Sequence, residues 1–402
     1  MKKMINILLF SYGVSIGLPD IALNFLSTRL RLDDGIMMIL FLCLFIDGLC
    51  HPYRFTKSQL KFLKLATLFA VFCLLSLCVT LILDLPFDSY PLFRMLGCML
   101  ILITLTTVLK SSKTIKWLGW GLAFGGGLII VQIIIRWYGI IGITSMEYSY
   151  QMKNALRFGT WNPNAASLYA IMFAFIMALI GCEMSGIKKR AFWLAAGVFS
   201  LIPLFLFSRG AMAGIGVAWL VFILLARQNR PAKAVVVLLF VGMIMYLSIY
   251  ESELIRSAIR INFSTGEGLS RHDIMWRTAL DLIANSPLIG HGFGQEVRLF
   301  GMRLSTGGMA HNVFLSVFVE GGLLGLLLFI WPLGYLGCRL WRFAHGRFYD
   351  TRAVICFAFL LGILVSNLSQ STLYWHKSQM LILSLMVVYL GKVEKSLLCK
   401  PI

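Results

Sequence analysis

Charged residues are scarce in this chain. Only 13% of the residues are Asp, Glu, Lys or Arg, whereas 59% are hydrophobic. A soluble domain usually has about a quarter of its residues charged, so the shortage excludes an ordinary soluble protein. A membrane span needs about 20 apolar residues, and 402 residues therefore have room for about a dozen spans. The composition predicts an all-α polytopic membrane protein.

Cysteine pairs and metal-ligand motifs are also missing. The nine cysteines include no C-x-x-C pair, and none lies between residues 251 and 311, so we expect neither a disulfide framework nor a thiolate metal site in that segment. No histidines have H-E-x-x-H or comparable spacing,. The glycines at 290–294 follow no strand and do not form a dinucleotide fingerprint. We expect no metal and no cofactor.

Acidic residues are outnumbered by basic ones, 17 to 36, which gives a net charge of +19. In a membrane protein, lysine and arginine mark cytoplasmic loops, and we prefer this interpretation to nucleic-acid binding. Basic clusters follow every second predicted span, which places both termini in the cytoplasm. The apolar N-terminus resembles a signal peptide but lacks a cleavage site, so we interpret it as an uncleaved first span. The predicted spans are 5–26, 35–50, 62–83, 92–109, 117–140, 164–182, 191–207, 211–226, 233–249, 312–337, 353–369 and 379–396,.

Residues 191–226 are apolar except around Ser208-Arg209-Gly210. As one helix they would be about 54 Å long at 1.5 Å per residue, against a hydrocarbon core of about 30 Å. We therefore predict a hairpin with its tip at these three residues. Gly210 would supply the turn, and Arg209 would lie at the external membrane face. Small-residue pairs such as Gly121-x-x-x-Gly125 predict close helix packing.

One long polar stretch interrupts the apolar chain, from Glu251 to His311. We expect it to lie outside the bilayer, on the side opposite the cytoplasm, as one large loop that forms a small helical cap. Within it, residues 271–284 have helical spacing, Asn285-Ser286-Pro287 is a stop signal, and residues 290–294 form a flexible loop. The predicted domains are nine transmembrane helices (1–249), the external cap (250–311), and three further helices with a cytoplasmic C-terminus (312–402).

Two arginines are candidates for binding phosphate. A fixed guanidinium at Arg209 suits paired hydrogen bonds to phosphate oxygens; the alternative is an arginine that only reaches the lipid headgroups. Arg271 lies in the loop that folds back towards the Arg209 tip, and two converging arginines would neutralise a diphosphate leaving group without a metal. Arg277 is a further candidate, with an ordinary solvated helix face as its alternative.

His311 and Asn312 lie where the polar stretch re-enters the membrane. An imidazole, with an ordinary pKa of about 6.5, is a natural general base for an acceptor hydroxyl; the alternative is an interfacial cap. Glu320 is either an orienting group or a carboxylate buried in the bundle. Asn164 and Lys153, with Asn162 and Arg157 beside them, are candidate hydrogen-bond donors to a sugar or a phosphate. The alternative is an ordinary polar loop.

Three motifs occur in order along the chain: Ser208-Arg209-Gly210-Ala211, Arg271-x-x-x-x-Trp276-x-x-Ala279 with Ser286-Pro287-Leu288-Ile289-Gly290-x-Gly292, and His311-Asn312-x-x-Leu315-x-x-x-x-Glu320-x-Gly322-x-x-Gly325. Together they resemble the O-antigen ligase and polymerase superfamily of bacterial envelope glycosyltransferases. The resemblance covers roughly residues 160–335.

The resemblance implies an enzyme of the bacterial inner membrane with a periplasmic active site. It implies glycan transfer from undecaprenyl diphosphate to lipid A–core, without a metal and with inversion. Arg209 and Arg271 would hold the diphosphate and His311 would be the general base; Arg277, Asn312, Glu320, Asn164 and Lys153 would bind substrate. The expected partners are the lipid-linked donor, the lipid A–core acceptor and membrane lipids, with no nucleic acid. The alternatives are a polymerase of the same superfamily and, third, a lipid-linked sugar transporter.

Overall fold

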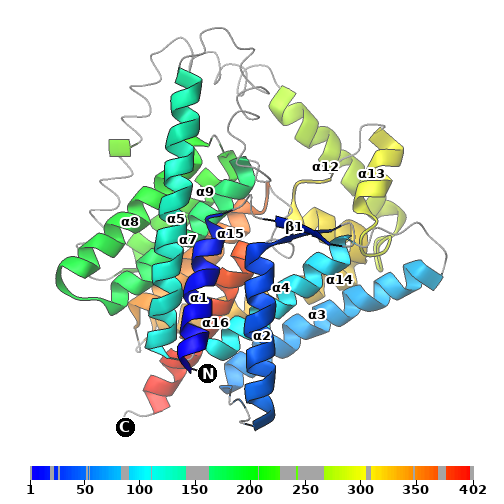
Figure 1. Cartoon of the computed structure of the whole chain (residues 1–402). Coiled ribbons are helices and arrows are strands. Elements are labelled where there is room, and N and C mark those ends of the chain that lie inside the picture. The colour runs from blue at the N-terminus through cyan, green and yellow to red at the C-terminus, as the bar shows by residue number, and fades with distance from the viewer. Residues whose placement is uncertain are drawn as a thin grey trace. The chain divides into compact units, whose positions relative to one another are not determined.

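The computed structural model of the chain describes residues 2–18, 22–25, 28–50, 53, 55–82, 90–109, 111–141, 163–206, 208–226, 241–242, 267–304, 309–346, 349–369 and 377–398. Within these ranges there are thirteen helices and one two-stranded hairpin (Figure 1). The predicted span 233–249 lies outside the described residues apart from 241–242. The chain divides into two compact units, residues 1–53 with 104–267 and residues 54–103 with 268–402.

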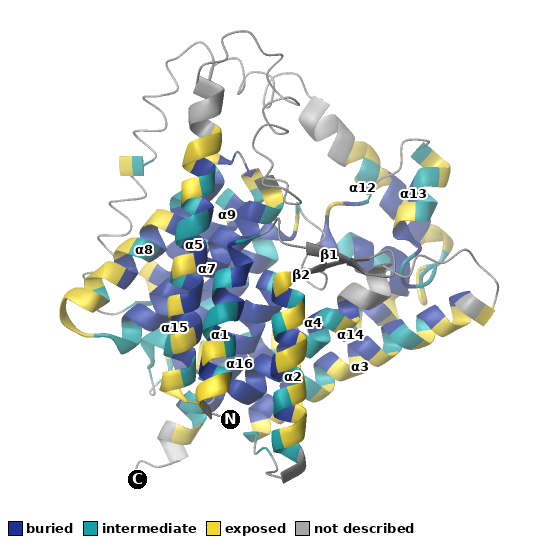
Figure 2. Ribbon diagram, viewed as in Figure 1, coloured by how far each residue is buried: buried dark blue, intermediate teal, exposed yellow. Residues whose placement is uncertain are grey.

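The structure is that of a helical membrane protein. Four described helices are long and apolar enough to cross a membrane: α3 (Lys57–Ile82), α5 (Ser112–Ile141), α7 (Pro163–Glu183) and α14 (Val313–His345). Hydrophobic side chains on the surface of other helices suit contact with lipid chains, such as Met38, Leu42 and Phe45, each more than half exposed on α2 (Leu32–Cys50) (Figure 2). The total of twelve spans stays a prediction.

The first unit contains α1 (Lys2–Ile16), α2, α5, α7, α8 (Gly186–Phe205) and α9 (Arg209–Leu225). Glycines let α1 and α5 pack backbone to backbone: a Cβ on Gly121 would lie 2.2 Å from the Phe10 carbonyl oxygen, and one on Gly125 would lie 2.4 Å from the Gly13 oxygen. The predicted close packing at this glycine pair is confirmed. Most of α7 is buried in the unit, with Ala166, Phe173 and Ala178 fully covered.

The predicted first span, 5–26, is wrong at its end. Helix α1 stops at Ile16, and an antiparallel hairpin follows, formed by β1 (Ala22–Phe25) and β2 (Thr28–Arg31). The sequence has a proline at position 19, which cannot donate a hydrogen bond to continue the helix. Hydrophobicity alone carried the predicted span past this stop.

The break between residues 191 and 226 is confirmed as two helices, α8 and α9. Its details differ from the prediction, because Arg209 and Gly210 are the first two residues of α9 rather than a turn. The chain leaves α8 at Leu206, and Ser208 precedes the new helix. Gly210 therefore does not supply the turn. Pro203 lies near the end of α8, where a proline is tolerated less well than in the first turn.

The second unit contains α3, α12 (Glu267–Asn285), α13 (Glu296–Leu304), α14, α15 (Thr351–Ser366) and α16 (Lys377–Leu398), and α4 (Tyr90–Val108) crosses the boundary between the units at residue 103. Helices α3 and α14 pack together through Phe69 and Phe329, whose ring centroids are 5.3 Å apart. Gly321 and Gly325 of α14 make room for the ring of Phe72. Near the far end of α14, Arg339 forms an ion pair with Glu394 of α16, which also accepts from Ser58 of α3.

Candidate functional site at the start of helix α14

The predicted helix in the polar stretch is present as α12, and it ends at Asn285 directly before Ser286-Pro287. Its apolar face forms a small core with residues of α13 and α14. The buried members of this core are Ala279, Leu282, Ile283, Phe300, Ala310 and Val319. Helix α13 was not predicted, because its nine residues carry three charged side chains among the apolar ones. These elements form a local scaffold around the start of α14.

The glycine loop after α12 packs into a break in α14. The break is at Gly322, where φ is +61°. The loop N–H groups of His291 and Gly292 donate to the carbonyl oxygens of Val319 and Glu320, each at 2.9 Å. In return, Leu323 donates to Pro287 and Leu324 to Leu288, at 2.8 and 3.2 Å. Loop formation is confirmed, and the loop is fixed to α14 by backbone hydrogen bonds on both sides of the break.

Neither Gly290 nor Gly322 has space for a side chain. A Cβ on Gly290 would lie 2.5 Å from the Glu320 carbonyl, and a Cβ on Gly322 would lie 2.4 Å from the Leu288 carbonyl. Both residues also have left-handed φ angles, which glycine adopts without steric cost. The glycines of the loop and the helix therefore serve a backbone-to-backbone contact.

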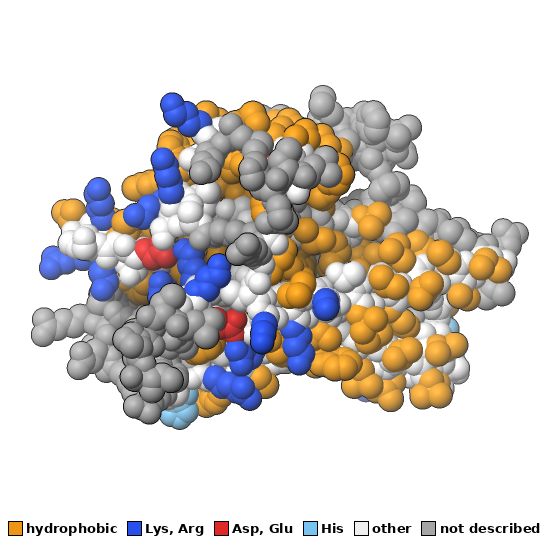
Figure 3. Space-filling model, turned by 90° about the horizontal axis from the view of Figure 1, so that it is seen from below, with side chains coloured by type: hydrophobic (Ala, Val, Ile, Leu, Met, Phe, Trp, Pro, Cys, Tyr) orange, Lys and Arg blue, Asp and Glu red, His pale blue; other side chains and the backbone are white. Residues whose placement is uncertain are grey.

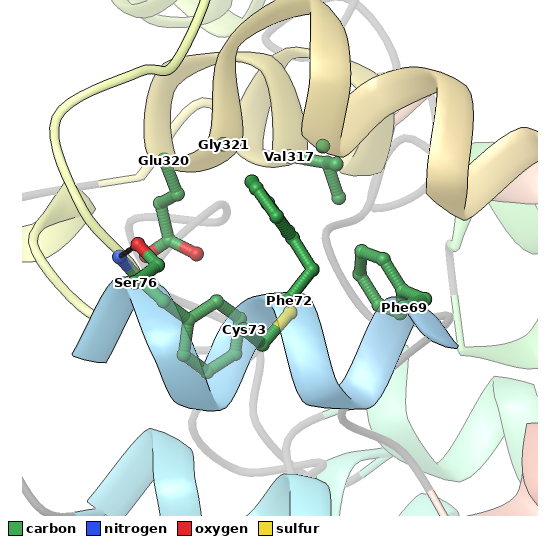
Figure 4. Close-up of a pocket in the computed structure, with 9 residues that line it drawn as sticks. Phe69, Phe72, Cys73, Ser76, Val317, Glu320 and Gly321 are labelled. Atoms are coloured by element: carbon green, nitrogen blue, oxygen red, sulfur yellow. Dashed lines mark hydrogen bonds between the residues drawn. The ribbon is translucent and has the colours of Figure 1, made fainter. Parts of the chain in front are cut away.

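Glu320 is buried, with 2% of its surface exposed. Its carboxylate accepts from the backbone N–H of Gly294 at 2.9 Å and from that of Glu296 at 3.4 Å. Figure 4 shows its side chain reaching from α14 towards Ser76 and Cys73 of α3, beside a cavity of about 10 Å³, which is room for about one water molecule. Glu320 thus orients the chain between the glycine loop and α13.

His311 is exposed and has a left-handed backbone, with φ at +50°. Among the described residues it is the only one other than glycine with a positive φ. For a residue with a side chain this conformation costs roughly 1–2 kcal/mol, and such strain persists only where surrounding contacts enforce it. The next residue, Asn312, caps α14, since its side-chain oxygen accepts from Phe314 and Leu315 N–H at 3.0 and 3.3 Å.

Two hydrogen bonds, one buried and one partly buried, hold the residue before His311. The N–H of Ala310 donates to Glu296 Oε1 at 2.8 Å, and the Ala310 carbonyl accepts from the Trp276 indole N–H at 2.9 Å. The same Glu296 oxygen accepts from the Ser316 hydroxyl at 2.8 Å. Burial raises the pKa of Glu296 to about 7 and is its largest cause, although the hydrogen bonds from Ala310 and Ser316 act to lower this pKa,.

The predicted site residues fall in both units. In the second unit, His311 and Asn312 directly precede α14, and Glu320 lies in its first turns. Arg277 is an exposed residue of α12 that pairs with Asp273 at 3.0 Å, as expected for a solvated helix face,. Arg271 lies on α12, and its side chain is outside the described part of the structure.

In the first unit, Arg209 is exposed at the start of α9 and Asn164 is exposed at the start of α7. Lys153, with Arg157 and Asn162, lies outside the described residues. The three predicted catalytic groups therefore come from α9, α12 and the residue before α14, and their convergence stays a prediction.

Two contributors to the site were not identified from the sequence as such. Glu296 was only one of many charged residues in the polar stretch, and Trp276 was noted only as part of a motif. A signal was present for Glu296, because a carboxylate lies two residues after the glycine loop and starts a short amphipathic segment. Its partner, the backbone N–H of Ala310, leaves no trace in a sequence.

Comparison with known proteins gives two findings. Residues 191–330 match the family model described as O-antigen ligase. An O-antigen ligase from Pseudomonas aeruginosa is 29% identical over 126 residues, which is 31% of this chain and 28% of the relative. The match thus spans less than a third of the relative's length. The resemblance to the O-antigen ligase superfamily is confirmed, and the matched segment contains Arg209, Arg271 and His311.

Proposed function

We propose that this protein is an O-antigen ligase that transfers a polysaccharide from undecaprenyl diphosphate to lipid A–core at the periplasmic face of the bacterial inner membrane. The observation that carries the proposal is His311. It is exposed in a strained left-handed backbone at the start of α14, within the segment that matches the O-antigen ligase family. Strained residues of this kind cluster at functional sites.

In the proposed reaction, His311 is the general base. It takes the proton of an acceptor sugar hydroxyl as the hydroxyl oxygen attacks the anomeric carbon of the donor. The new glycosidic bond forms while the bond between that carbon and the diphosphate oxygen breaks, and the diphosphate leaves with the electron pair. Attack from the face opposite the leaving group inverts the anomeric centre.

Two arginines would stabilise the leaving group in this reaction. Arg209 and Arg271 would bind the diphosphate oxygens and offset the charge that develops on them. Arg277, Asn164 and Lys153 are proposed to assist substrate binding. Asn312 and Glu320 would act close to His311, where Asn312 fixes the helix start and Glu320 fixes the adjacent loop. The proposed chemistry needs no cofactor and no metal.

The proposed topology has twelve spans, cytoplasmic termini and a periplasmic cap at residues 250–311. The distribution of charge supports it, because basic residues cluster at particular helix ends. The described examples are Lys113 and Lys116 at the start of α5, Lys188, Lys189 and Arg190 at the start of α8, and Arg339 and Arg342 towards the end of α14. On the face seen in Figure 3, lysine and arginine side chains greatly outnumber acidic ones.

A polymerase of the same superfamily is the alternative function. It would use the same donor chemistry and a carrier-linked repeat unit as the acceptor. A strain that lacks the protein separates the two: long carrier-linked chains that never reach lipid A–core indicate a ligase, whereas single repeats on lipid A–core indicate a polymerase. Movement of a labelled lipid-linked sugar across liposomes without covalent transfer would instead indicate a transporter.

The test of the proposed chemistry is the His311→Ala variant. We expect its transfer rate in membranes to fall about 10²–10⁴-fold, the usual contribution of a general base. His345→Ala is the matched control, since His345 lies at the opposite end of α14 against Trp341, with ring centroids 5.0 Å apart. A normal rate of attachment to lipid A–core by His311→Ala would refute the general-base role.

The arginine role has its own test. Arg209→Ala should reduce transfer strongly, and Arg209→Lys should retain only part of the activity, because an ammonium group cannot form the paired hydrogen bonds of a guanidinium. Equal activity of the lysine and arginine proteins would mean that charge alone matters at this position. Full activity of Arg209→Ala would remove Arg209 from the site.

A further inference from the structure

The residue before His311, Ala310, is held by hydrogen bonds at both its N–H and its carbonyl group. Ala310 is fully buried, and its N–H and its carbonyl each have one partner from a different helix: Glu296 of α13 and Trp276 of α12. On the other side of His311, the N–H of Val313 donates to the Asn367 carbonyl at 3.0 Å. The chain is therefore fixed immediately before and two residues after His311. Of the two residues between these points, His311 takes the left-handed φ.

Glu296 is itself held in place before it reaches Ala310. Its side chain accepts from Ser316 in the first turn of α14, and its own backbone N–H donates to Glu320. With 2% of its surface exposed, the Glu296 carboxyl does not face a substrate. Its position makes it suited to orienting a peptide, and unsuited to contact with the donor or the acceptor.

We propose that Glu296 and Trp276 are positioning residues of the transfer reaction: they hold Ala310 from its two sides and so fix the direction in which His311 presents its imidazole. The proposal rests on the proposed role of His311 as general base. Its physical basis is that a general base must lie within hydrogen-bond reach of the proton that it takes. A displacement of about 1 Å at a reacting group is enough to lower the rate about 10²-fold.

The variants differ in whether the acceptor oxygen survives. Glu296→Ala removes it, and we expect kcat to fall about 10²-fold, with little change in KM because Glu296 does not face the substrate. Glu296→Gln keeps an oxygen acceptor for Ala310 and Ser316, and we expect it to retain most of the activity. Trp276→Phe keeps a ring but loses the indole N–H, and we expect a reduction of about 10-fold.

A measurement that does not depend on catalysis tests whether Glu296 holds the N–H of Ala310. Hydrogen–deuterium exchange of peptides containing Ala310 should be slow in the parent protein and in Glu296→Gln, and clearly faster in Glu296→Ala. Glu394→Ala is the matched control, since it makes the same change at a largely covered, paired carboxylate near the far end of α14. It should alter neither the exchange of Ala310 nor kcat.

The outcomes separate the two proposals. Unchanged exchange in Glu296→Ala, or faster exchange with a normal kcat, would overturn the positioning role. Full activity of His311→Ala would overturn the proposed function of His311, and the exchange experiment would still decide whether Glu296 holds Ala310. The inference also fails if Glu296→Gln is as inactive as Glu296→Ala while its exchange stays slow, because the carboxyl would then be needed for more than hydrogen-bond acceptance.

Discussion

Each end of α14 contacts a glutamate of another helix, and the two glutamates have different partners. Near the start of the helix, Glu296 accepts hydrogen bonds from neutral groups, the N–H of Ala310 and the hydroxyl of Ser316. Near the end, Glu394 is paired with the cationic side chain of Arg339 and also accepts from Ser58. One carboxyl binds the backbone beside a candidate catalytic residue, and the other ties three helices together.

The difference in hydrogen-bond partners indicates a different role for the glutamate at each end of α14. A cationic partner compensates for the removal of a carboxylate from water, so the pair of Glu394 and Arg339 keeps α14 and α16 in register. Neutral donors compensate less, and burial accordingly raises the pKa of Glu296 to about 7,. The buried carboxyl of Glu296 and the strained backbone of His311 therefore both lower the stability at the start of α14. Strain of this kind is common at functional sites.

The largest expected effect concerns the backbone contact at the start of α14. Gly322→Ala would place a Cβ 2.4 Å from the carbonyl of Leu288 in a backbone with φ at +61°, and we expect a loss of at least about 4 kcal/mol in the free energy of unfolding. Thermal unfolding in detergent would measure it. Gly334→Ala is the control in the same helix: a Cβ there meets nothing within 4 Å, and it should be neutral or stabilising by up to about 1 kcal/mol. Similar unfolding temperatures for the two variants would contradict the described contact.

The next effect concerns the ion pair at the other end. Arg339→Met leaves Glu394 without its cation, and we expect a loss of about 3 kcal/mol in stability, with normal activity for each folded molecule. The double variant Arg339→Met with Glu394→Gln should recover most of the loss, because no unpaired charge remains. A double variant as unstable as the single one would show that the side chains matter here through packing and that the charge pair is secondary.

The sequence was informative about the fold where the signal is local. Apolar runs and their breaks predicted α8 and α9 as separate helices, and the stop at Asn285-Ser286-Pro287 predicted the end of α12. Prediction failed where the local signal for a helix end or a helix was weak compared with the composition around it. Apolar residues on both sides of Pro19-Asp20 obscured the end of α1 at Ile16. The charged residues of α13 obscured a helix whose apolar face packs against residues of α12 and α14.

The candidate site was predictable only in part. His311 and Asn312 were identified by residue type and by their place at a membrane boundary, and Asn312 proves to cap α14. The support of His311 could not be predicted, since Glu296 and Trp276 act on the backbone of Ala310, and any residue other than proline offers the same N–H and carbonyl. Glu320 illustrates the same limit: its burial was one of two alternatives, but its bond to the N–H of Gly294 depends on the break at Gly322.

A pH experiment tests the protonation of Glu296 at the start of α14. The pKa of Glu296 rises from its ordinary 4.5 to about 7 in the folded protein, so between these values the folded state keeps a proton that the unfolded state releases. Stability from this group is therefore lost as pH rises from about 4.5 to about 7, by up to about 3 kcal/mol, and is constant above that range. Glu296→Gln cannot titrate and should lack this component. Unfolding temperatures of the parent and the variant, compared from pH 5 to 8, should diverge; parallel curves would show that Glu296 does not change its charge in this range.

The smallest expected effect isolates the strain at His311. Glycine adopts a left-handed backbone freely, whereas alanine does not, so His311→Gly should be more stable than His311→Ala by roughly 0.5–1 kcal/mol. The same pair of changes at Leu280, an exposed residue inside α12, should have the opposite sign, with glycine less stable than alanine by about 1 kcal/mol. Both His311 variants lack the imidazole and should be equally inactive, which separates stability from chemistry. If alanine were the more stable residue at both positions, the backbone at His311 would not be strained. The hydrogen bonds from Glu296 and Trp276 to Ala310 would then not be needed to enforce its conformation.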